Sequence, residues 1–153
     1  SIANRVYCRV CSCKCDLVVS NLGNITFLLN RRSEAEFCFE LLVMIFVFGS
    51  NLAGRHGKGA ALYARQKHGA EYGVGEGRTG DSYALPTKDE RIRTRPLSGV
   101  RDSVDKFIEY AKANPDLHFE VTKVGCGLAG FKEFEIAPLF KNAPSNCRLP
   151  DGW

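Results

Sequence analysis

Two glycine-rich segments carry the residues that could do chemistry in this chain. The first is residues 54–59 (GRHGKG), just after an apolar run that ends at Asn51, and the second is residues 125–130 (GCGLAG). Glycine lets a backbone approach a ligand closely, and the N–H groups that open a helix bind anions. Arg55 and Lys58 add positive charge to the first segment. The two segments therefore predict a site for an anionic ligand, with Asn51 at the strand end where ligand-contacting side chains usually lie.

Three side chains are candidates for holding or deprotonating a water molecule in such a site, namely Asn51, His56 and Asp89. His56 titrates near neutral pH, which suits a general base, although an exposed loop histidine is the alternative. Asp89 and its neighbour Lys88 follow a predicted strand, where they form either part of the site or a solvated charged turn. Asn51 could instead hold a turn through its own backbone. The sequence shows no pairing of a nucleophile with a base.

The cysteines do not predict a metal site. Residues 8–15 contain the spacing C-x-x-C-x-C-x-C, but no second cluster and no histidine before His56 completes a zinc site, so no metal is predicted. Cys126 lies inside the second glycine-rich segment, where helix-terminal N–H groups could lower its pKa.

Residues 75–80 (GEGRTG) formally match the dinucleotide-binding pattern G-x-G-x-x-G. That fingerprint needs a strand before it and a helix after it. Here a strand-like segment, residues 82–85, follows instead. The match is therefore interpreted as a coincidence, and a nicotinamide dinucleotide site is rejected.

The apolar pattern predicts alternating strands and helices from residue 44 onward. Strands and helices in this order predict a mainly parallel sheet with helices on both faces, a three-layer α/β/α fold. Both glycine-rich segments would then meet at one edge of the sheet. The expected strands are residues 45–48, 82–85 and 119–124. The expected helices are residues 59–66, a second helix capped by Ser98, and residues 131–141, in which Phe134 is expected to point largely inward. Residues 72–81 are expected to be loop.

The composition changes sharply near residue 43, because five of the seven cysteines lie before this position. Residues 1–43 are interpreted as a cysteine-biased extension of doubtful structure and residues 44–153 as the domain; the alternative is strands at 17–20 and 25–29 with a helix at 34–42. The net charge of +4 is mild and no basic block is present, so nucleic acid is not the expected partner. No apolar run could span a membrane, and a cytoplasmic location is expected.

The residues after 44 resemble a known family. The strings FVFGSN (46–51) and GKGAA (57–61) resemble the strand and glycine loop of macro domains, which bind ADP-ribose, and VGCGLAGF (124–131) resembles their diphosphate-wrapping loop. With SYALPTKD (82–89) and APSNC (143–147), the chain resembles still more closely a macro-domain-like family of bacterial and phage proteins. The resemblance implies a macro-like α/β/α fold and no cofactor.

The resemblance also implies roles for individual residues. Asn51 would contact the distal ribose, Gly57 and Gly59 would lie against that ribose and the phosphates, and Phe131 would pack near the ribose. The aspartate that binds adenine in macro domains has no counterpart, because residues 23–26 (GNIT) carry asparagine and lie too far upstream. The remaining predicted ligand contacts are Gly49, Ser50, Lys58, Thr87, Gly125, Cys126, Gly127, Leu128, Ala129 and Gly130.

Three functions fit these expectations. The first is a module that binds ADP-ribose or a related nucleotide diphosphate, free or on an ADP-ribosylated macromolecule. The second is a hydrolase that releases ADP-ribose or phosphate, with a water between Asn51 and the two loops and with His56 or Asp89 as proton acceptor. The third is a phage or host protein-interaction module that keeps the pocket only as scaffold. In the first two, residues 73–80 could form a lid.

Overall fold

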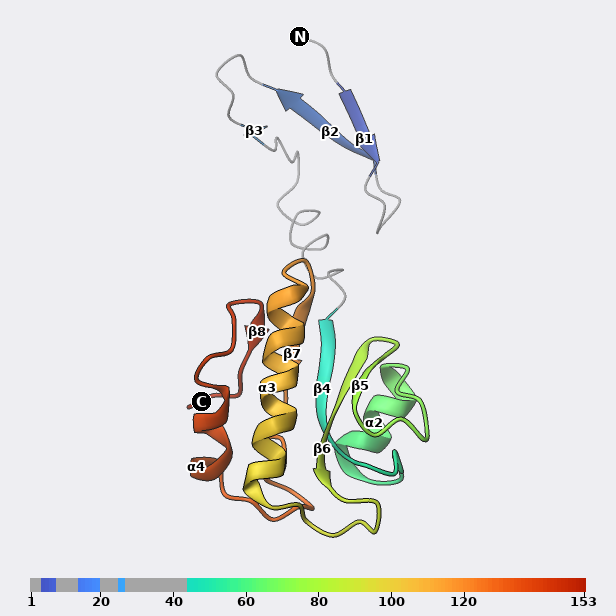
Figure 1. Cartoon of the computed structure of the whole chain (residues 1–153). Helices are drawn as coiled ribbons and strands as arrows, with labels where there is room; N and C mark the ends of the chain where they lie inside the picture. The colour runs from blue at the N-terminus through green and yellow to red at the C-terminus, as the bar shows by residue number, and fades with distance from the viewer. Residues whose placement is uncertain (1–3, 8–13, 20–24, 27–43) are drawn as a thin grey trace. The chain divides into compact units, whose positions relative to one another are not determined.

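The computed structural model describes residues 4–7, 14–19, 25–26 and 44–153, and the chain divides into two compact units, residues 1–43 and 44–153 (Figure 1). The first unit contains an antiparallel sheet in the order β1-β2-β3, made of β1 (Asn4–Tyr7), β2 (Lys14–Val19) and β3 (Ile25–Thr26). The helix considered for residues 34–42 and most of the cysteine run lie outside the described residues.

The second unit is built on a five-stranded sheet in the order β5-β6-β4-β7-β8. Its central strand, β4, pairs in parallel with β6 and with β7, and β7 pairs in parallel with β8. Only β5 runs antiparallel, against β6. The mainly parallel sheet is thus confirmed. The strands are β4 (Met44–Asn51), β5 (Gly77–Thr79), β6 (Ser82–Lys88), β7 (His118–Val121) and β8 (Cys147–Arg148).

Helices cover both faces of this sheet and complete the predicted three layers (Figure 1). Ile45 and Val47 of β4 belong to the larger core, with α3 (Leu97–Ala113) and the pair α4 (Glu133–Ile136) and η1 (Ala137–Phe140). Phe48 belongs to a smaller core on the other face, with α2 (Gly59–Lys67). Because β4 alternates its side chains between the faces, one strand anchors both cores.

Four local expectations are wrong. Residues 72–81 are not all loop, since β5 lies within them. The helix expected at 131–141 is α4 followed by the 3₁₀ turn η1, because Pro138 has no N–H with which to continue an α-helix. Phe134 is 77 % exposed rather than inward, as a four-residue helix turns it outward. The N-cap of α3 is Pro96, not Ser98.

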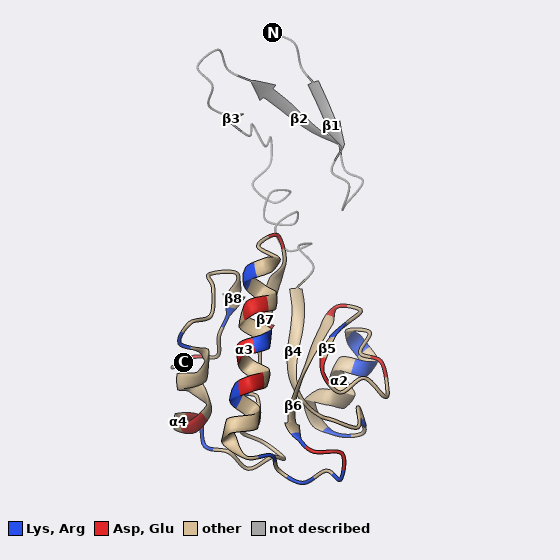
Figure 2. Cartoon of the chain, viewed as in Figure 1, with Lys and Arg blue, Asp and Glu red and all other residues tan. Residues whose placement is uncertain are grey.

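Charges of both signs alternate along α3 in this unit (Figure 2). Among the described residues, no helix is long and apolar enough to cross a membrane.

Candidate functional site

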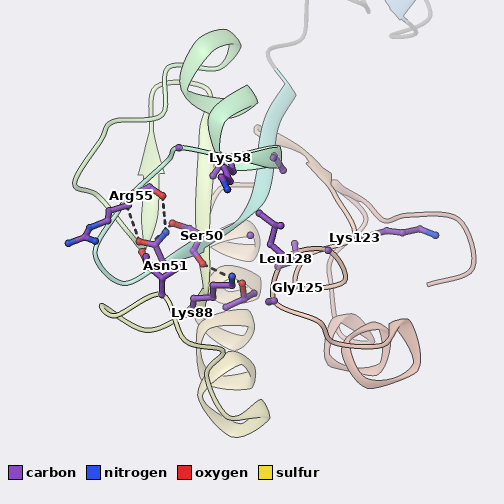
Figure 3. Close-up of a pocket in the computed structure, with 18 residues that line it drawn as sticks. Ser50, Asn51, Arg55, Lys58, Lys88, Lys123, Gly125 and Leu128 are labelled. Atoms are coloured by element: carbon purple, nitrogen blue, oxygen red, sulfur yellow. Dashed lines mark hydrogen bonds between the residues drawn. The ribbon is translucent and has the colours of Figure 1, made fainter.

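A cavity of about 600 Å³ opens where β4, β6 and β7 end (Figure 3). The bulge between Ser50 and Asn51 shifts the register of β4 against β6 at this edge, so that Asn51 lies opposite Lys88. Both glycine-rich segments reach the cavity, as expected for loops that follow parallel strands. The lining residues are 49–51, 55, 57–61, 87–88, 92, 123–125 and 127–129.

The amino end of α2 forms part of the wall of this cavity. Leu62 is the first residue whose N–H bonds within this helix, to the Lys58 carbonyl at 3.3 Å, and residues 59–61 line the cavity. No side chain caps the helix and its first turn contains no acidic residue. The N–H groups of residues 59–61 have no partner within the helix, so together with the helix dipole they favour an anion here.

The charged residues that line the cavity are all cations: Arg55, Lys58, Lys88 and Lys123. Lys123 is already paired with Glu133 at 2.7 Å, and Figure 3 shows Arg55 and Lys123 extending away from the residues between them. Lys58 and Lys88 are therefore the two cations best placed for a ligand. No carboxylate is among the lining residues, so the wall of the cavity carries positive charge.

Asn51 holds the turn that leads into the first glycine-rich segment. Its Nδ2 donates to the Arg55 carbonyl at 2.8 Å, and its Oδ1 accepts the Arg55 N–H at 2.9 Å. The side chain is almost wholly buried yet lines the cavity. Each amide atom keeps one further hydrogen-bonding position, so holding the turn leaves Asn51 able to contact a ligand.

His56 is fully buried, so the expectation of an exposed loop histidine is wrong. Its Nε2 lies 3.1 Å from Ser50 Oγ, and its ring packs edge-on against Phe48. Burial, and secondarily the charge of Arg65, lowers the pKa of His56, which keeps the ring neutral at neutral pH. His56 does not line the cavity, whereas Ser50 does. No pairing of a nucleophile with a base is evident in the sequence, but the fold places the Ser50 hydroxyl within hydrogen-bonding distance of the His56 ring.

Asp89 is engaged in a turn of its own outside the cavity lining. Its Oδ1 accepts the N–H groups of Arg91 and Arg93 at 2.9 and 2.8 Å, and its Oδ2 pairs with the Arg93 guanidinium at 2.9 Å. Hydrogen bonding to Arg93 above all lowers the pKa of Asp89. A carboxylate stabilised in this way is a poor proton acceptor, and the structure does not bring it to the cavity.

The second glycine-rich segment lines the cavity only in part, because Cys126, Gly130 and Phe131 do not contribute to the wall. Burial raises the pKa of the Cys126 thiol, which overturns the expected lowering. The helix α4 begins only at Glu133, and after burial the negative charge of Glu133 raises the pKa of this thiol further. Phe131 instead stabilises the loop, because its backbone N–H donates a hydrogen bond to the Gly125 carbonyl at 3.0 Å. Among the other predicted contacts, Thr87 lines the wall and donates to the Ser50 carbonyl at 3.3 Å.

Residues 73–80, proposed as a lid, do not line the cavity. Gly73 N–H donates to the Gly54 carbonyl at 2.8 Å, and the backbone of Gly75 packs directly on the carbonyls of Asn51 and Leu52. Glu76 pairs with Lys106 of α3 at 3.1 Å. This segment therefore supports the 51–54 turn from outside the site.

Several lining residues were missing from the predicted set. Lys88 can be inferred from the sequence, since it follows Thr87 at the end of a predicted strand, where a site residue and a solvated turn are both consistent with the pattern. Ile92 cannot be inferred in this way, because its position depends on the turn around Asp89. The other additions are Arg55, Ala60, Ala61, Lys123 and Val124.

A mainly parallel sheet between helices, with two glycine-rich loops at its carboxyl edge, gives an α/β fold like that of macro domains. Among solved structures, the chain is similar to the macrodomain of Mycobacterium tuberculosis DarG, with a TM-score of 0.52 and 16 % identity over 69 % of this chain and 88 % of that one. This likeness shows the fold.

Two weaker likenesses have TM-scores below 0.5. Thermosipho africanus DarTG in complex with ADP-ribose gives 0.49, with 19 % identity over 72 % of this chain and 39 % of that one. A Bacteroides thetaiotaomicron protein of unknown function gives 0.43, with 18 % identity over 65 % and 80 %. No family model and no curated protein matches the sequence.

Proposed function

We propose that the chain binds ADP-ribose or a related nucleotide diphosphate in this cavity. The observation that carries the proposal is the uncapped amino end of α2, whose residues 59–61 form part of the wall. Backbone N–H groups at a helix start bind phosphate oxygens without any side chain. A diphosphate placed there would receive the hydrogen bonds that the helix cannot make internally.

The charge and size of the cavity support the same ligand class. Lys58 and Lys88 line it and no carboxylate does, which suits a ligand that carries two phosphates. Its volume of about 600 Å³ lies within the range usual for small-molecule sites, roughly 300–1,000 Å³. The fold shared with the M. tuberculosis DarG macrodomain agrees with this ligand class.

Calorimetric titration of ADP-ribose into the full chain tests the proposal. We expect binding in the micromolar range, weakened roughly 10- to 100-fold in Lys58→Ala because a hydrogen bond to a charged group contributes about 1.5–3 kcal/mol. Lys67→Ala is the matched control, since Lys67 lies in the last turn of the same helix and outside the cavity. Folded protein that releases no heat with ADP-ribose would favour the protein-interaction module instead.

A second candidate function, hydrolysis of a bond to the ligand, is favoured by the Ser50–His56 contact. Water would attack the carbon or phosphorus that bears the leaving group. As the new bond to the water oxygen forms, the bond to the leaving group breaks and the leaving group departs with the electron pair of that bond. The water proton would pass to Ser50 Oγ while the hydroxyl proton of Ser50 passes to His56 Nε2. His56 would then give this proton up, by way of Ser50, to the leaving group or to solvent. Burial keeps the His56 ring neutral, so one ring nitrogen is free to accept a proton, although the lowered pKa makes the ring a weaker base than a free imidazole.

Product analysis separates turnover from binding. If the chain is a hydrolase, His56→Asn and Ser50→Ala should both lose release of ADP-ribose from an ADP-ribosylated substrate while they still bind ADP-ribose. Absence of product from the wild-type chain under saturating substrate would leave binding as the function.

A further inference from the structure

Two exposed apolar side chains, Ile92 and Leu128, line the cavity. Ile92 is 37 % exposed and Leu128 is 68 % exposed. Within residues 44–153 the other large exposed apolar side chains are Tyr63, Tyr72 and Phe134, and none of these lines the cavity. Apolar surface is left in water at the site itself, where a ligand can cover it.

The backbone of Ile92 is held in an unfavourable conformation. Its φ of 63° makes it the only non-glycine residue with positive φ in the described part of the chain, and a β-branched side chain makes that conformation a genuine outlier. The carboxylate of Asp89 imposes it by accepting the N–H groups of both neighbours, Arg91 and Arg93. The Ile92 N–H itself donates to the Asp89 carbonyl at 3.1 Å. Such strain persists where the surroundings over-determine it, often at binding sites.

The loops that carry the two side chains are joined to each other. Thr94 Oγ1 donates to the carbonyl of Ala129, next to Leu128, at 2.8 Å. On its other side Leu128 reaches the start of α2, since its Cδ1 lies 3.7 Å from the position that a Cβ on Gly59 would take. A hydrogen bond thus joins the two loops close to Ile92 and Leu128, and Leu128 adjoins the amides proposed for the diphosphate.

We propose that Ile92 and Leu128 form an apolar clamp for the nucleobase of the ligand. This inference rests on the proposed function and specifies which part of the site binds the phosphates and which part binds the base. A nucleotide diphosphate has an anionic segment and a flat, weakly polar ring. The anionic segment binds to the α2 amides, Lys58 and Lys88. The ring then covers the apolar side chains that the two loops leave exposed.

Titration of the full chain with ADP and, separately, with inorganic pyrophosphate tests the clamp, since only ADP carries a base. Ile92→Asn removes the apolar side chain and keeps the turn, because asparagine adopts positive φ more readily than isoleucine. We expect this variant to bind ADP at least tenfold more weakly, to bind pyrophosphate within twofold of wild type, and to show an unchanged or higher Tm. Phe134→Asn, equally apolar and more exposed but outside the cavity, should match wild type with both ligands.

The other outcomes overturn the inference in distinguishable ways. If Ile92→Asn binds ADP as wild type does, the clamp is wrong and the diphosphate site stands. If the variant loses ADP and pyrophosphate equally, Ile92 supports the anion site rather than the base. If wild type binds ADP-ribose but neither of these compounds, the clamp is wrong and the proposed function stands; if it binds none of the three, both fail. Should Ile92→Asn not fold, Leu128→Asn on the other loop is tested against the same two ligands with the same expected result.

Discussion

Replacing Gly75 with alanine should damage the site although Gly75 does not line it. A Cβ at this position would press on the carbonyl oxygen of Asn51 and lie 2.7 Å from that of Leu52. Both are backbone atoms, so no side chain can turn aside. The Leu52 oxygen alone would have to withdraw by about 0.7 Å to restore an ordinary contact of 3.4 Å.

The cost follows from what the displaced atoms hold. Overpacking of this kind costs about 1–3 kcal/mol. The Asn51 carbonyl also accepts the Gly54 N–H at 2.9 Å, and weakening that bond adds about 1 kcal/mol. We therefore expect Gly75→Ala to lower the free energy of unfolding by roughly 2–4 kcal/mol, and to weaken binding of ADP-ribose because Asn51 moves with its turn.

Gly73→Ala is the matched control two residues away. Nothing lies within 4 Å of a Cβ at Gly73, but its φ is +95°. Alanine there should cost only the conformational penalty of positive φ, about 1–2 kcal/mol, and leave ligand affinity unchanged. Urea unfolding followed by the fluorescence of Trp153 measures both variants; Trp153 is the only tryptophan in the chain and its ring lies 5.4 Å from that of Phe140. If the free energy of unfolding of Gly75→Ala is as high as that of Gly73→Ala, the reasoning is refuted.

Three further predictions concern charge and protonation. Because burial, and then Arg65, lowers the pKa of His56, the unfolded chain binds a proton that the folded chain does not as the pH falls below about 6.5. The free energy of unfolding should therefore drop by up to about 1.4 kcal/mol per pH unit in that range, and an equal drop in His56→Asn would show that other groups cause it. Because burial raises the pKa of Cys126, iodoacetamide at pH 7.5 should modify this thiol more slowly in native than in urea-unfolded protein, as followed by peptide mass; equal rates would contradict the burial argument. Added sodium chloride should weaken binding of ADP-ribose less steeply in Lys58→Ala than in wild type, and parallel salt dependences would exclude Lys58 from the anion site.

Much of the fold could be predicted because it depends on local patterns. The apolar residues of β4 alternate between two cores, and the glycine-rich segments follow strand ends, so the mainly parallel sheet and the position of the cavity follow from the order of elements. Asn51, placed at the strand end, does reach the cavity wall. Pro138 shows the limit of this approach, since one residue divides a helix that periodicity made continuous.

The site residues that could not be predicted depend on contacts between distant or turned segments. His56 is buried because its ring meets Phe48 and Ser50, which no spacing in the sequence specifies. Ile92 reaches the cavity because the Asp89 carboxylate forces a turn that isoleucine alone disfavours. In both cases tertiary contacts override the local preference of the residue.

The cavity walls come from strands that pair in parallel across long stretches of chain. Val47 of β4 lies beside Val121 of β7 on one side and Tyr83 of β6 on the other. The entropy of closing such loops must be overcome before these contacts stabilise anything, which makes parallel pairing a slow and late event in folding. A partly folded chain therefore lacks the cavity in which we propose that a nucleotide binds. A bound ligand would therefore lower the rate of unfolding and leave the rate of folding almost unchanged.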